Sequence, residues 1–342
     1  MGFFRKAVIQ SVLVLLAGFG LSSAYAGEAV KVMTRNMDAG TDFGFFIANL
    51  DDPAPGVQQT LQEVLKNDFA TRAQLLAKEI ALTKPDLVGL QEATIWSLPT
   101  PNGTDTIDQL ELLLGALSSD QYNLPYAIVA VNTLTNLGFP IPNVGIAQFT
   151  DRDVVIMRVG SAVTTSNSSS HIYAQLVPLP PPFGTVKRGW ISVDATVGGK
   201  TFKFVTTHLE SSAGLYGDPT VDLIQAAQAQ ELANAFADSP IPIVIAGDFN
   251  SNATHTPVDR TQSFNIMLGK GYVDAWSALH RGIPGFTWPL YLEDPLRDHT
   301  QGPKERIDLV FSKGVYPTSV TRTGLQWPFG SDHAGVLATF DF

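Results

Sequence analysis

The side chains of this sequence that could carry out chemistry fall into seven short motifs, in which Asp, Glu, Asn and His predominate. Most of the motifs follow an apolar run, so we expect them to meet at one rim of a sheet. They offer no Ser or Cys nucleophile, and they suit the metal-assisted transfer of a phosphoryl group to water. The motifs are Thr34-Arg35-Asn36-Met37-Asp38, Gln91-Glu92, Asp151-Arg152-Asp153, Thr206-Thr207-His208-Leu209, Gly247-Asp248-Phe249-Asn250, Arg306-Ile307-Asp308 and Ser331-Asp332-His333.

Glu92 is the strongest candidate metal ligand, because it follows a mostly apolar run where a carboxylate is costly unless a cation or a donor faces it. Asp38, Asp248, Asp308 and Asp332 are expected near it at the same rim. Several carboxylates at close quarters repel one another unless a cation or a proton compensates. Oxygen ligands of this kind favour Mg²⁺, Mn²⁺ or Ca²⁺ over zinc or copper. The predicted cofactor is Mg²⁺, for which Mn²⁺ should substitute and Ca²⁺ is an alternative.

The remaining motif residues are candidates for proton transfer and charge stabilisation. Asp248 follows the apolar run Ile243-Val244-Ile245 and could orient or deprotonate water, while the Asn250 amide could donate to charge on phosphorus. His208 and His333 each adjoin an apolar strand, so one could protonate the leaving oxygen and the other donate to a phosphoryl oxygen. Asp308 is suited to holding His333 in its protonated form. Arg152 is open to two roles, contact with a phosphate or pairing with its flanking acids.

The sequence lacks the motifs that identify several other classes of enzyme. The sequence contains no G-x-S-x-G, G-x-x-x-x-G-K-[ST], H-E-x-x-H or G-x-G-x-x-G motif, so serine hydrolases, P-loop nucleotide hydrolases, zinc proteases and dinucleotide-binding enzymes are disfavoured. Zero cysteines exclude disulfides, thiol catalysis and cysteine-ligated zinc.

Residues 1–26 have the pattern of a secretory signal peptide, with basic Arg5-Lys6, an apolar stretch over 7–24 and an Ala24-Tyr25-Ala26 cleavage site. The alternative is an uncleaved membrane anchor. Cleavage would make the protein secreted or periplasmic and leave 316 residues (342 minus 26) as a single catalytic domain over 27–342. Loss of Arg5 and Lys6 would move the net charge from −10 to −12, and such an acidic surface does not attract polyanions by itself. We expect a monomer.

Apolar periodicity predicts two sheets packed face to face with helices outside, a four-layer α/β/β/α sandwich of the α+β class. The Gly198-Gly199 turn predicts a hairpin, and two polar or proline-rich stretches, 166–170 and 178–182, are expected as loops. Helices are predicted over 57–81, 105–117, 222–236 and 263–268. Strands are predicted over 30–33, 86–90, 126–131, 154–159, 190–197, 202–207, 241–246, 307–311, 318–323 and 335–340.

In this order, the motifs resemble those of the endonuclease/exonuclease/phosphatase superfamily, which has the deoxyribonuclease I-like fold. The resemblance spans nearly the whole chain after residue 26 and implies a Mg²⁺-dependent site formed by loops of two packed mixed sheets. It implies that Asn36 contacts the substrate phosphate, that Glu92 and Asp332 lie on the metal side, and that Asp38 aids metal binding. It further implies that the catalytic residues are His208, Asp248, Asn250, Asp308 and His333.

Two classes of function compete. The leading one is a secreted phosphoesterase, within which an extracellular nuclease and a sphingomyelinase- or phospholipase C-like lipid phosphodiesterase are both open. A nuclease needs basic residues along a groove, for which Lys187-Arg188 and Arg297 are the candidates. A lipid phosphodiesterase needs exposed apolar loops, for which Trp327 and Phe329 are candidates for a peripheral membrane contact. A non-catalytic binding protein on the same scaffold is disfavoured, because every expected catalytic residue is present.

Overall fold

The computed structural model describes residues 27–254, 262–291 and 302–342, and its largest element is an eight-stranded sheet. The order in this sheet is β15-β16-β1-β2-β6-β3-β4, and β5 also pairs with β6. Its strands are β1 (Ala29–Asn36), β2 (Leu87–Gln91), β3 (Ile95–Thr100), β4 (Gly103–Asp108), β5 (Tyr126–Ile141), β6 (Gly145–Arg158), β15 (Pro317–Thr323) and β16 (Gly335–Asp341).

A second sheet of six strands has the order β13-β14-β12-β11-β10-β7. The parallel pairing of β11 with β12 and the antiparallel pairing of β12 with β14 make it a mixed sheet. A separate pair of two-residue strands, β8 (Val177–Pro178) and β9 (Thr185–Val186), closes a surface turn. The strands of the second sheet are β7 (Thr164–Ile172), β10 (Gly189–Val197), β11 (Lys200–His208), β12 (Ile243–Asp248), β13 (Val273–Asp274) and β14 (Asp308–Lys313).

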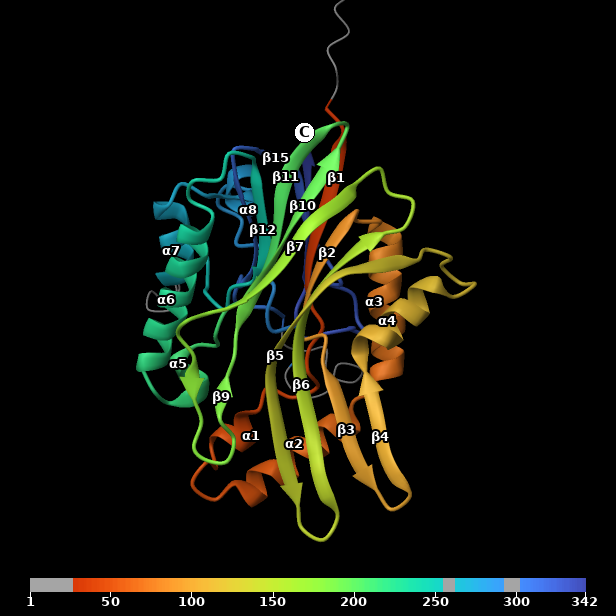
Figure 1. The fold of residues 1–342 in the computed structure, drawn as a ribbon, viewed down its shortest axis with the longest axis vertical. Helices are drawn as coiled ribbons and strands as arrows, with labels where there is room; N and C mark the ends of the chain where they lie inside the picture. Colours follow the sequence, from red (N-terminus) through yellow and green to blue (C-terminus); the bar gives the residue numbers. More distant parts are fainter. Residues whose placement is uncertain (1–26, 255–261, 292–301) are drawn as a thin grey trace, which may run out of the picture.

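Helices cover the outer faces of both sheets, so the predicted four-layer sandwich is confirmed (Figure 1). Apolar side chains of α3 and α4 pack on the eight-stranded sheet, and those of α6 and α7 pack on the six-stranded one. The helices are α1 (Gly44–Ile47), α2 (Pro53–Lys66), α3 (Phe69–Thr83), α4 (Gln109–Ser118), α5 (Ala213–Tyr216), α6 (Thr220–Ala235), α7 (Gln262–Gly269) and α8 (Ala275–Leu279).

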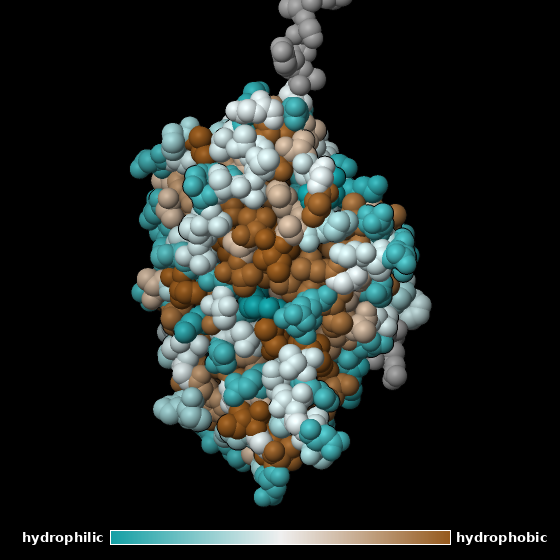
Figure 2. Space-filling view, turned by 45° about the vertical axis from the view of Figure 1, so that its right-hand side comes forward, coloured by the Kyte–Doolittle hydropathy of each residue, from teal (hydrophilic) through white to brown (hydrophobic). Residues whose placement is uncertain are grey.

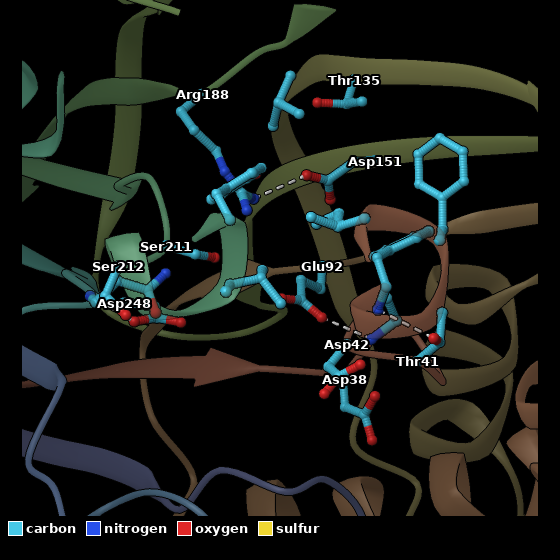
Figure 3. Close-up of a pocket in the computed structure, with 18 of the residues that line it drawn as sticks. Asp38, Thr41, Asp42, Glu92, Thr135, Asp151, Arg188, Ser211, Ser212 and Asp248 are labelled. Atoms are coloured by element: carbon cyan, nitrogen blue, oxygen red, sulfur yellow. Dashed lines mark hydrogen bonds and ion pairs between the residues drawn. The ribbon is translucent and has the colours of Figure 1, made fainter. Parts of the chain in front are cut away.

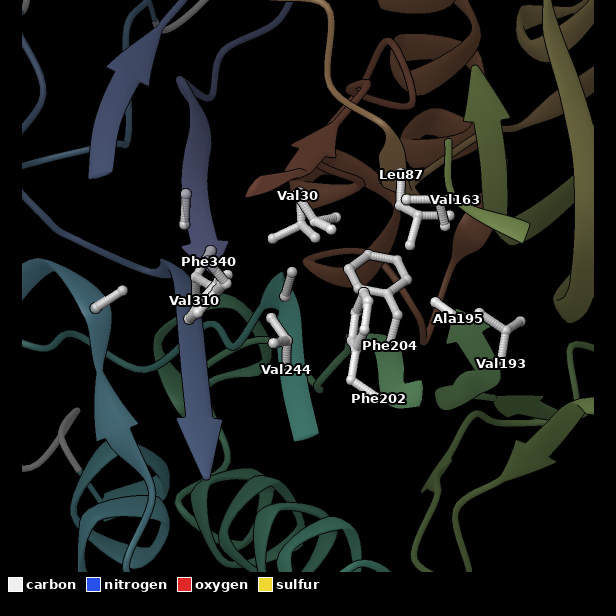
Figure 4. Packing of buried hydrophobic residues seen from close by; sticks show 14 of the residues in the cluster. Val30, Leu87, Val163, Val193, Ala195, Phe202, Phe204, Val244, Val310 and Phe340 are labelled. Carbon is white, nitrogen blue, oxygen red and sulfur yellow. The ribbon is translucent and has the colours of Figure 1, made fainter. Parts of the chain in front are cut away.

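The main core lies between the two sheets (Figure 4). Val30 and Leu87 of the eight-stranded sheet belong to the same buried cluster as Phe204 and Val244 of the other sheet. The sheets come so close at Gly89 that a Cβ atom there would lie 2.1 Å from Oγ1 of Thr206. Glycine is therefore required at this point of contact.

A separate aromatic cluster extends the fold below the sandwich in Figure 1, where α1, α2 and the far ends of β3 to β6 lie. Phe46 of α1 packs edge-on against Phe139, with ring centroids 5.1 Å apart, and against Phe183 at 4.7 Å. Phe43 packs against Phe149 at 4.8 Å. This cluster holds α1 in place beside the ends of the strands that carry the polar motifs.

Two of the predicted helices have different bounds. The helix expected over 57–81 is broken at Asn67 and Asp68, where the Asp68 side chain accepts a hydrogen bond from the backbone of Thr71 and so begins α3. The helix expected from residue 105 begins only at Gln109, because Asp108 caps it by accepting from Leu110 N and Glu111 N. Capping side chains override the apolar period in both places.

Two further predictions also need correction, one of a loop and one of the start of a strand. The polar stretch 166–170 was expected as a loop but lies in β7, an edge strand that pairs with β10. Its serines are mostly exposed there, as an edge position permits. Asp151-Arg152-Asp153, expected to open a strand, lies inside the long strand β6. The proline-rich stretch 178–182 does lie at a turn, although Leu179 is buried within it.

The surface mixes polar and apolar side chains, with an apolar area near the middle of the face in Figure 2. Phe329, expected to touch a membrane, is buried against Tyr291, Leu290 and Ala334, so that expectation is wrong for Phe329. Trp327 is 51% exposed. Among the described residues, no helix has the length and apolar character needed to span a bilayer. The predicted signal peptide over 1–26 lies outside the described residues.

Candidate active site

Three motif residues form a single row across the six-stranded sheet. His208 at the end of β11 pairs with Asp248 at the end of β12, and Asp248 pairs with Asp308 at the start of β14. Directly paired residues point to the same face of a sheet. All three side chains are buried, so the apolar strands that precede or follow them bring these polar groups into the gap between the sheets.

His333 reaches this row from the loop before β16. Its Nδ1 lies 2.9 Å from Oδ2 and 3.1 Å from Oδ1 of Asp308, and its Nε2 lies 3.8 Å from Oδ2 of Asp248. Burial disfavours the charged imidazolium, but Asp308, Asp332 and Asp248 outweigh it and raise the pKa of His333 well above its usual value. The predicted pairing with Asp308 is present, and it favours a protonated His333 at neutral pH.

His208 lies on the other side of Asp248 in the opposite electrostatic setting. Its Nδ1 lies 2.9 Å from Nη1 of Arg188, and its Nε2 lies 3.5 Å from Oδ2 of Asp248. Burial, followed by the charges of Arg188 and His333, lowers the pKa of His208 well below its usual value. Because a guanidinium only donates, Nδ1 must accept, and the proton of neutral His208 is on Nε2, which faces Asp248.

Asn36, Glu92 and Asp248 are joined by hydrogen bonds across the two sheets. Asn36 Nδ2 donates to Glu92 Oε1 at 3.1 Å and to Asp248 Oδ2 at 3.0 Å. The backbone N–H of Asn250 donates to Asp248 Oδ1 at 2.9 Å, and the Asn250 side-chain nitrogen lies 3.1 Å from Nε2 of His208. The structure therefore brings the motifs from both halves of the chain into one cluster.

Glu92 has little compensation for its charge. The residue has a positive φ of 54° directly after β2, and Oε2 accepts from Ala39 N at 2.6 Å. Burial raises the pKa of Glu92 to about 8, and the neighbouring charges of Asp151, Asp332 and Asp38 add to this effect. A carboxylate oxygen in this position is suited to a hard divalent cation, which would replace the proton.

The other two acids of the expected metal side have protein partners. Asp38 Oδ2 lies 3.1 Å from Nη2 of Arg72 and accepts a hydrogen bond from Tyr291, while Oδ1 accepts from Gly40 N. The charge of Asp38 is thus already compensated by the Arg72 guanidinium, which counts against a direct metal contact. Asp332 Oδ2 accepts from Trp288 Nε1 at 2.8 Å, and burial raises the pKa of Asp332 to about 6.

A compact set of ligands also exists within the row itself. Asp248, Asp308 and His333 each offer an atom within 4.8 Å of the others. In the described parts of the chain this is the only such group of three histidine or acidic side chains. It combines two acids with a histidine that Asp308 favours in its charged form, so it resembles an acid–base relay more than an oxygen cage for Mg²⁺.

Comparison with known proteins agrees with this geometry. The model of the endonuclease/exonuclease/phosphatase family matches residues 64–333, a span that includes most of the motifs. The chain belongs to the endonuclease/exonuclease/phosphatase family. Members of this family hydrolyse phosphoester bonds. No curated protein sequence matches the chain significantly.

Solved structures share the fold at low sequence identity. A member from Beutenbergia cavernae DSM 12333 is 21% identical, with a TM-score of 0.56 over 92% of this chain and 72% of that one. D. rerio TDP2, complexed with a single strand DNA product, is 17% identical with a TM-score of 0.53 over 92% and 99%. A Bacteroides thetaiotaomicron mannosyl-6-phosphatase is 16% identical with a TM-score of 0.54 over 92% and 100%.

Arg188 contacts the candidate catalytic residue His208, although the sequence did not predict this position for it. It was expected as a basic residue along a nucleic-acid groove, but it is buried behind His208. Its Nη1 lies 3.3 Å from Asp151 Oδ2, and its Nε lies 3.7 Å from Glu210 Oε1. Arg152 forms its ion pair with Asp108 at 2.6 Å rather than with either of its flanking acids. Lys187 is exposed, and Arg297 lies outside the described residues.

A pocket of about 370 Å³ opens directly onto these groups. Figure 3 shows the carboxylates of Asp38, Glu92, Asp151 and Asp248 around it, with Arg188 joined to Asp151 at one end. Asn250, Asp332 and His333 also line it. Beyond the polar groups, the wall becomes apolar and is formed by α1, α5, β5, β6 and the turn between β8 and β9.

Proposed function

We propose that this chain is a divalent-metal-dependent phosphoesterase, which hydrolyses phosphodiester or phosphomonoester bonds by in-line attack of water. The observation that carries the proposal is the position of Asp248 Oδ2. It lies 3.5 Å from Nε2 of His208 and 3.8 Å from Nε2 of His333. One histidine is held neutral and the other charged, so a neutral N–H donor and a charged acid flank one buried carboxylate.

The acids on the open side of the site support a metal. Glu92 would hold the cation, with Asp332 beside it, and Asp38 would take a supporting place because Arg72 and Tyr291 already occupy its carboxylate. Mg²⁺ is the cation that these oxygen ligands favour, with Mn²⁺ as a substitute and Ca²⁺ as an alternative. When bound, it would supply charge stabilisation for the phosphoryl oxygens.

The protein groups divide the remaining work. Asp248 would orient the attacking water and accept its proton, because burial raises the pKa of Asp248 to about 6. Charged His333, held by Asp308, would donate to the leaving or phosphoryl oxygen. His208 and Asn250 would donate to phosphoryl oxygens through Nε2–H and the side-chain amide. Asn36 would orient Glu92 and Asp248, to which it is bonded, beside the substrate phosphate.

The substrate is proposed to present one phosphate rather than a long polyanion. The net charge of the whole chain is −10, and of the two candidate groove residues Lys187 and Arg188, only Lys187 is exposed. Nucleic acid is the second candidate, supported by the shared fold with D. rerio TDP2, which was solved with a DNA product. The mannosyl-6-phosphatase supports the alternative of a small monoester.

The proposal includes export as a monomer and a peripheral membrane contact limited to Trp327. The pattern of residues 1–26 supports export, and N-terminal sequencing of secreted protein should then begin at Gly27.

The function is tested with DNA, RNA, sphingomyelin, phosphatidylcholine and sugar or inositol phosphates, each with Mg²⁺ and with chelator. We expect turnover only with the metal, and faster on esters with a single phosphate than on DNA. Metal-independent turnover, or none on any substrate, would contradict the proposal.

A further inference from the structure

We propose that the apolar part of the pocket beside the catalytic groups is a binding site for an apolar ester group of the substrate. The inference rests on the proposed function and narrows it to phosphoesters that carry an alkyl, acyl or aryl group next to the phosphate. The phosphate would lie at the end lined by Asp248, Asn250 and His333, and the apolar group would extend away from them.

The two ends of the pocket differ sharply in chemistry. Apolar side chains come from four separate parts of the chain, so the apolar wall is not an accident of one loop. These side chains are Phe43, Phe46 and Ile47 beside α1, Leu137 and Phe149 of β5 and β6, Leu179 and Val186 near β8 and β9, and Leu215 of α5. A site of about 370 Å³ is within the usual size range for small-molecule pockets.

The apolar wall is supported from behind, so it is formed before a ligand arrives. Phe43 stacks with Trp96 and Phe139, which do not line the pocket, with ring centroids 6.1 and 6.4 Å apart. Phe46 is held by Phe183 at 4.7 Å and by Phe139 at 5.1 Å. Apolar surface kept open in this way loses its contact with water when an alkyl or aryl group enters, which favours binding.

The charges of the pocket disfavour a second phosphate in the same place. Arg188 is the one Lys or Arg among the residues that line it. That guanidinium is already in contact with His208, Asp151 and Glu210. Asp42 and Asp151 lie on the same walls. A further phosphate would be partly buried beside acids without a free cation, which is costly, whereas an uncharged apolar group meets no such penalty.

The test uses alkylphosphonates, which carry the phosphoryl group but cannot be hydrolysed. Dissociation constants of methyl-, butyl- and octylphosphonate would be measured by calorimetry on the full chain with Mg²⁺. Burial of a methylene group improves binding by about fourfold, so we expect octylphosphonate to bind at least tenfold more tightly than methylphosphonate. Equal affinities of the three ligands would overturn the inference.

Two variants locate the effect. Ile47→Asp in α1 and Leu215→Asp in α5 each place a carboxylate on the pocket wall at a half-buried position, and each should reduce the octyl-to-methyl affinity ratio by at least tenfold. Ile146→Asp is the matched control, because Ile146 is 55% exposed and does not line the pocket; its ratio should equal that of the wild type. A ratio unchanged in both pocket variants would place the apolar contact elsewhere and refute the inference.

The outcome separates this inference from the proposed function. If no phosphoester is turned over but octylphosphonate still binds more tightly than methylphosphonate, the catalytic proposal fails and the apolar site stands. If small esters are turned over with no preference for an alkyl group, the catalytic proposal stands and the apolar site is refuted. Hydrolysis of dihexanoyl phosphatidylcholine, compared with phosphatidylcholine vesicles, then distinguishes a soluble ester from a membrane lipid as the source of the apolar group.

Discussion

Nη1 of Arg188 lies 2.9 Å from Nδ1 of His208, so a buried cation, rather than an acid, orients this histidine. The guanidinium can only donate, which fixes the imidazole proton on Nε2, and its charge lowers the pKa of His208. His333 has the opposite arrangement, with Asp308 at its Nδ1. Two histidines of similar distance from Asp248 are thus held in different protonation states by different partners.

Arg188→Met should raise the pKa of His208 and destabilise the protein. The change removes the donor to Nδ1 and leaves Asp151 and Glu210 without their cation, which costs about 3–5 kcal/mol for a broken buried ion pair. Nitrogen chemical shifts of His208 would report both the tautomer and the titration. Arg152→Met is the matched control, since Arg152 pairs with Asp108 and does not contact His208. A wild-type His208 titration in Arg188→Met would contradict the assigned role.

His208 also makes a pH-dependent contribution to stability. Its pKa is lowered in the folded state, so the unfolded chain binds more protons than the folded one below the ordinary histidine pKa. The free energy of unfolding should therefore fall as the pH drops through that value. His208→Gln should flatten this part of the stability curve measured by chemical denaturation. A curve that keeps its full slope in the variant would show that other groups cause the acid sensitivity.

Metal affinity should rise with pH because Glu92 must lose a proton. Its pKa of about 8 in the absence of a cation means that binding below that pH displaces one proton from this group. The affinity for Mn²⁺ should increase roughly tenfold between about pH 6.5 and 7.5 and level off above about pH 8. Calorimetry in buffers of different ionisation enthalpy would count the released proton. Glu92→Gln should bind Mn²⁺ weakly and lose the pH dependence, and an equal affinity at both pH values would argue against Glu92 as the ligand.

Asp308→Asn should act through His333. The substitution removes the strongest contribution that raises the pKa of His333, so the alkaline limb of the pH–rate profile should move to lower pH. His333→Ala should slow turnover by roughly 10²–10⁴-fold. The double variant should be no slower than His333→Ala alone. Asp194→Asn, which disrupts a remote pair with Lys203, should leave the profile unchanged, and additive losses for Asp308 and His333 would disprove the coupling.

Gly89→Ala should destabilise the fold by about 1–3 kcal/mol, the usual cost of overpacking, because its Cβ would collide with Thr206 of the facing sheet. Gly115→Ala is the matched control within the exposed face of α4, where an added Cβ meets nothing within 4 Å. It should stabilise the helix by about 0.5–1 kcal/mol. Denaturant midpoints of the two variants should shift in opposite directions, and a neutral Gly89→Ala would show that the sheets can separate at this point.

Much of the site could be predicted because its residues adjoin apolar strands. Glu92, His208 and Asp248 follow runs whose burial is evident from their composition, and the strand ends of a packed sandwich meet at one rim. The pairing of Asp308 with His333 was also predicted, and the two side chains are in contact. The predicted role of Asp38 in metal binding is supported least. Its partner Arg72 lies on a helix, and apolar periodicity does not show that this helix face meets the end of the first strand.

Arg188 was missed although a signal existed. The Gly198-Gly199 turn pairs Val197 with Lys200, and counting back along this hairpin pairs Gly189 with His208. This register puts Arg188 one residue from the position opposite the histidine, within reach of its long side chain. The aromatic cluster and the pocket could not be derived in the same way, because they depend on the lengths of β5 and β6, which extend well beyond the predicted runs. The alternation of apolar and polar residues does not indicate where such long strands end.

The row of His208, Asp248 and Asp308 belongs to three adjacent strands of one sheet, whereas the apolar wall of the pocket comes from α1, α5 and the far ends of β5 and β6. In the proposed binding mode, reactivity and selectivity are encoded by different stretches of the gene. Insertions or point changes between residues 41 and 50, or between 137 and 149, could retarget the enzyme without disturbing the register of the strands that hold its reactive groups. Divergence within such a lineage should concentrate in these segments, and grafting them between relatives is a direct route to exchanging specificity.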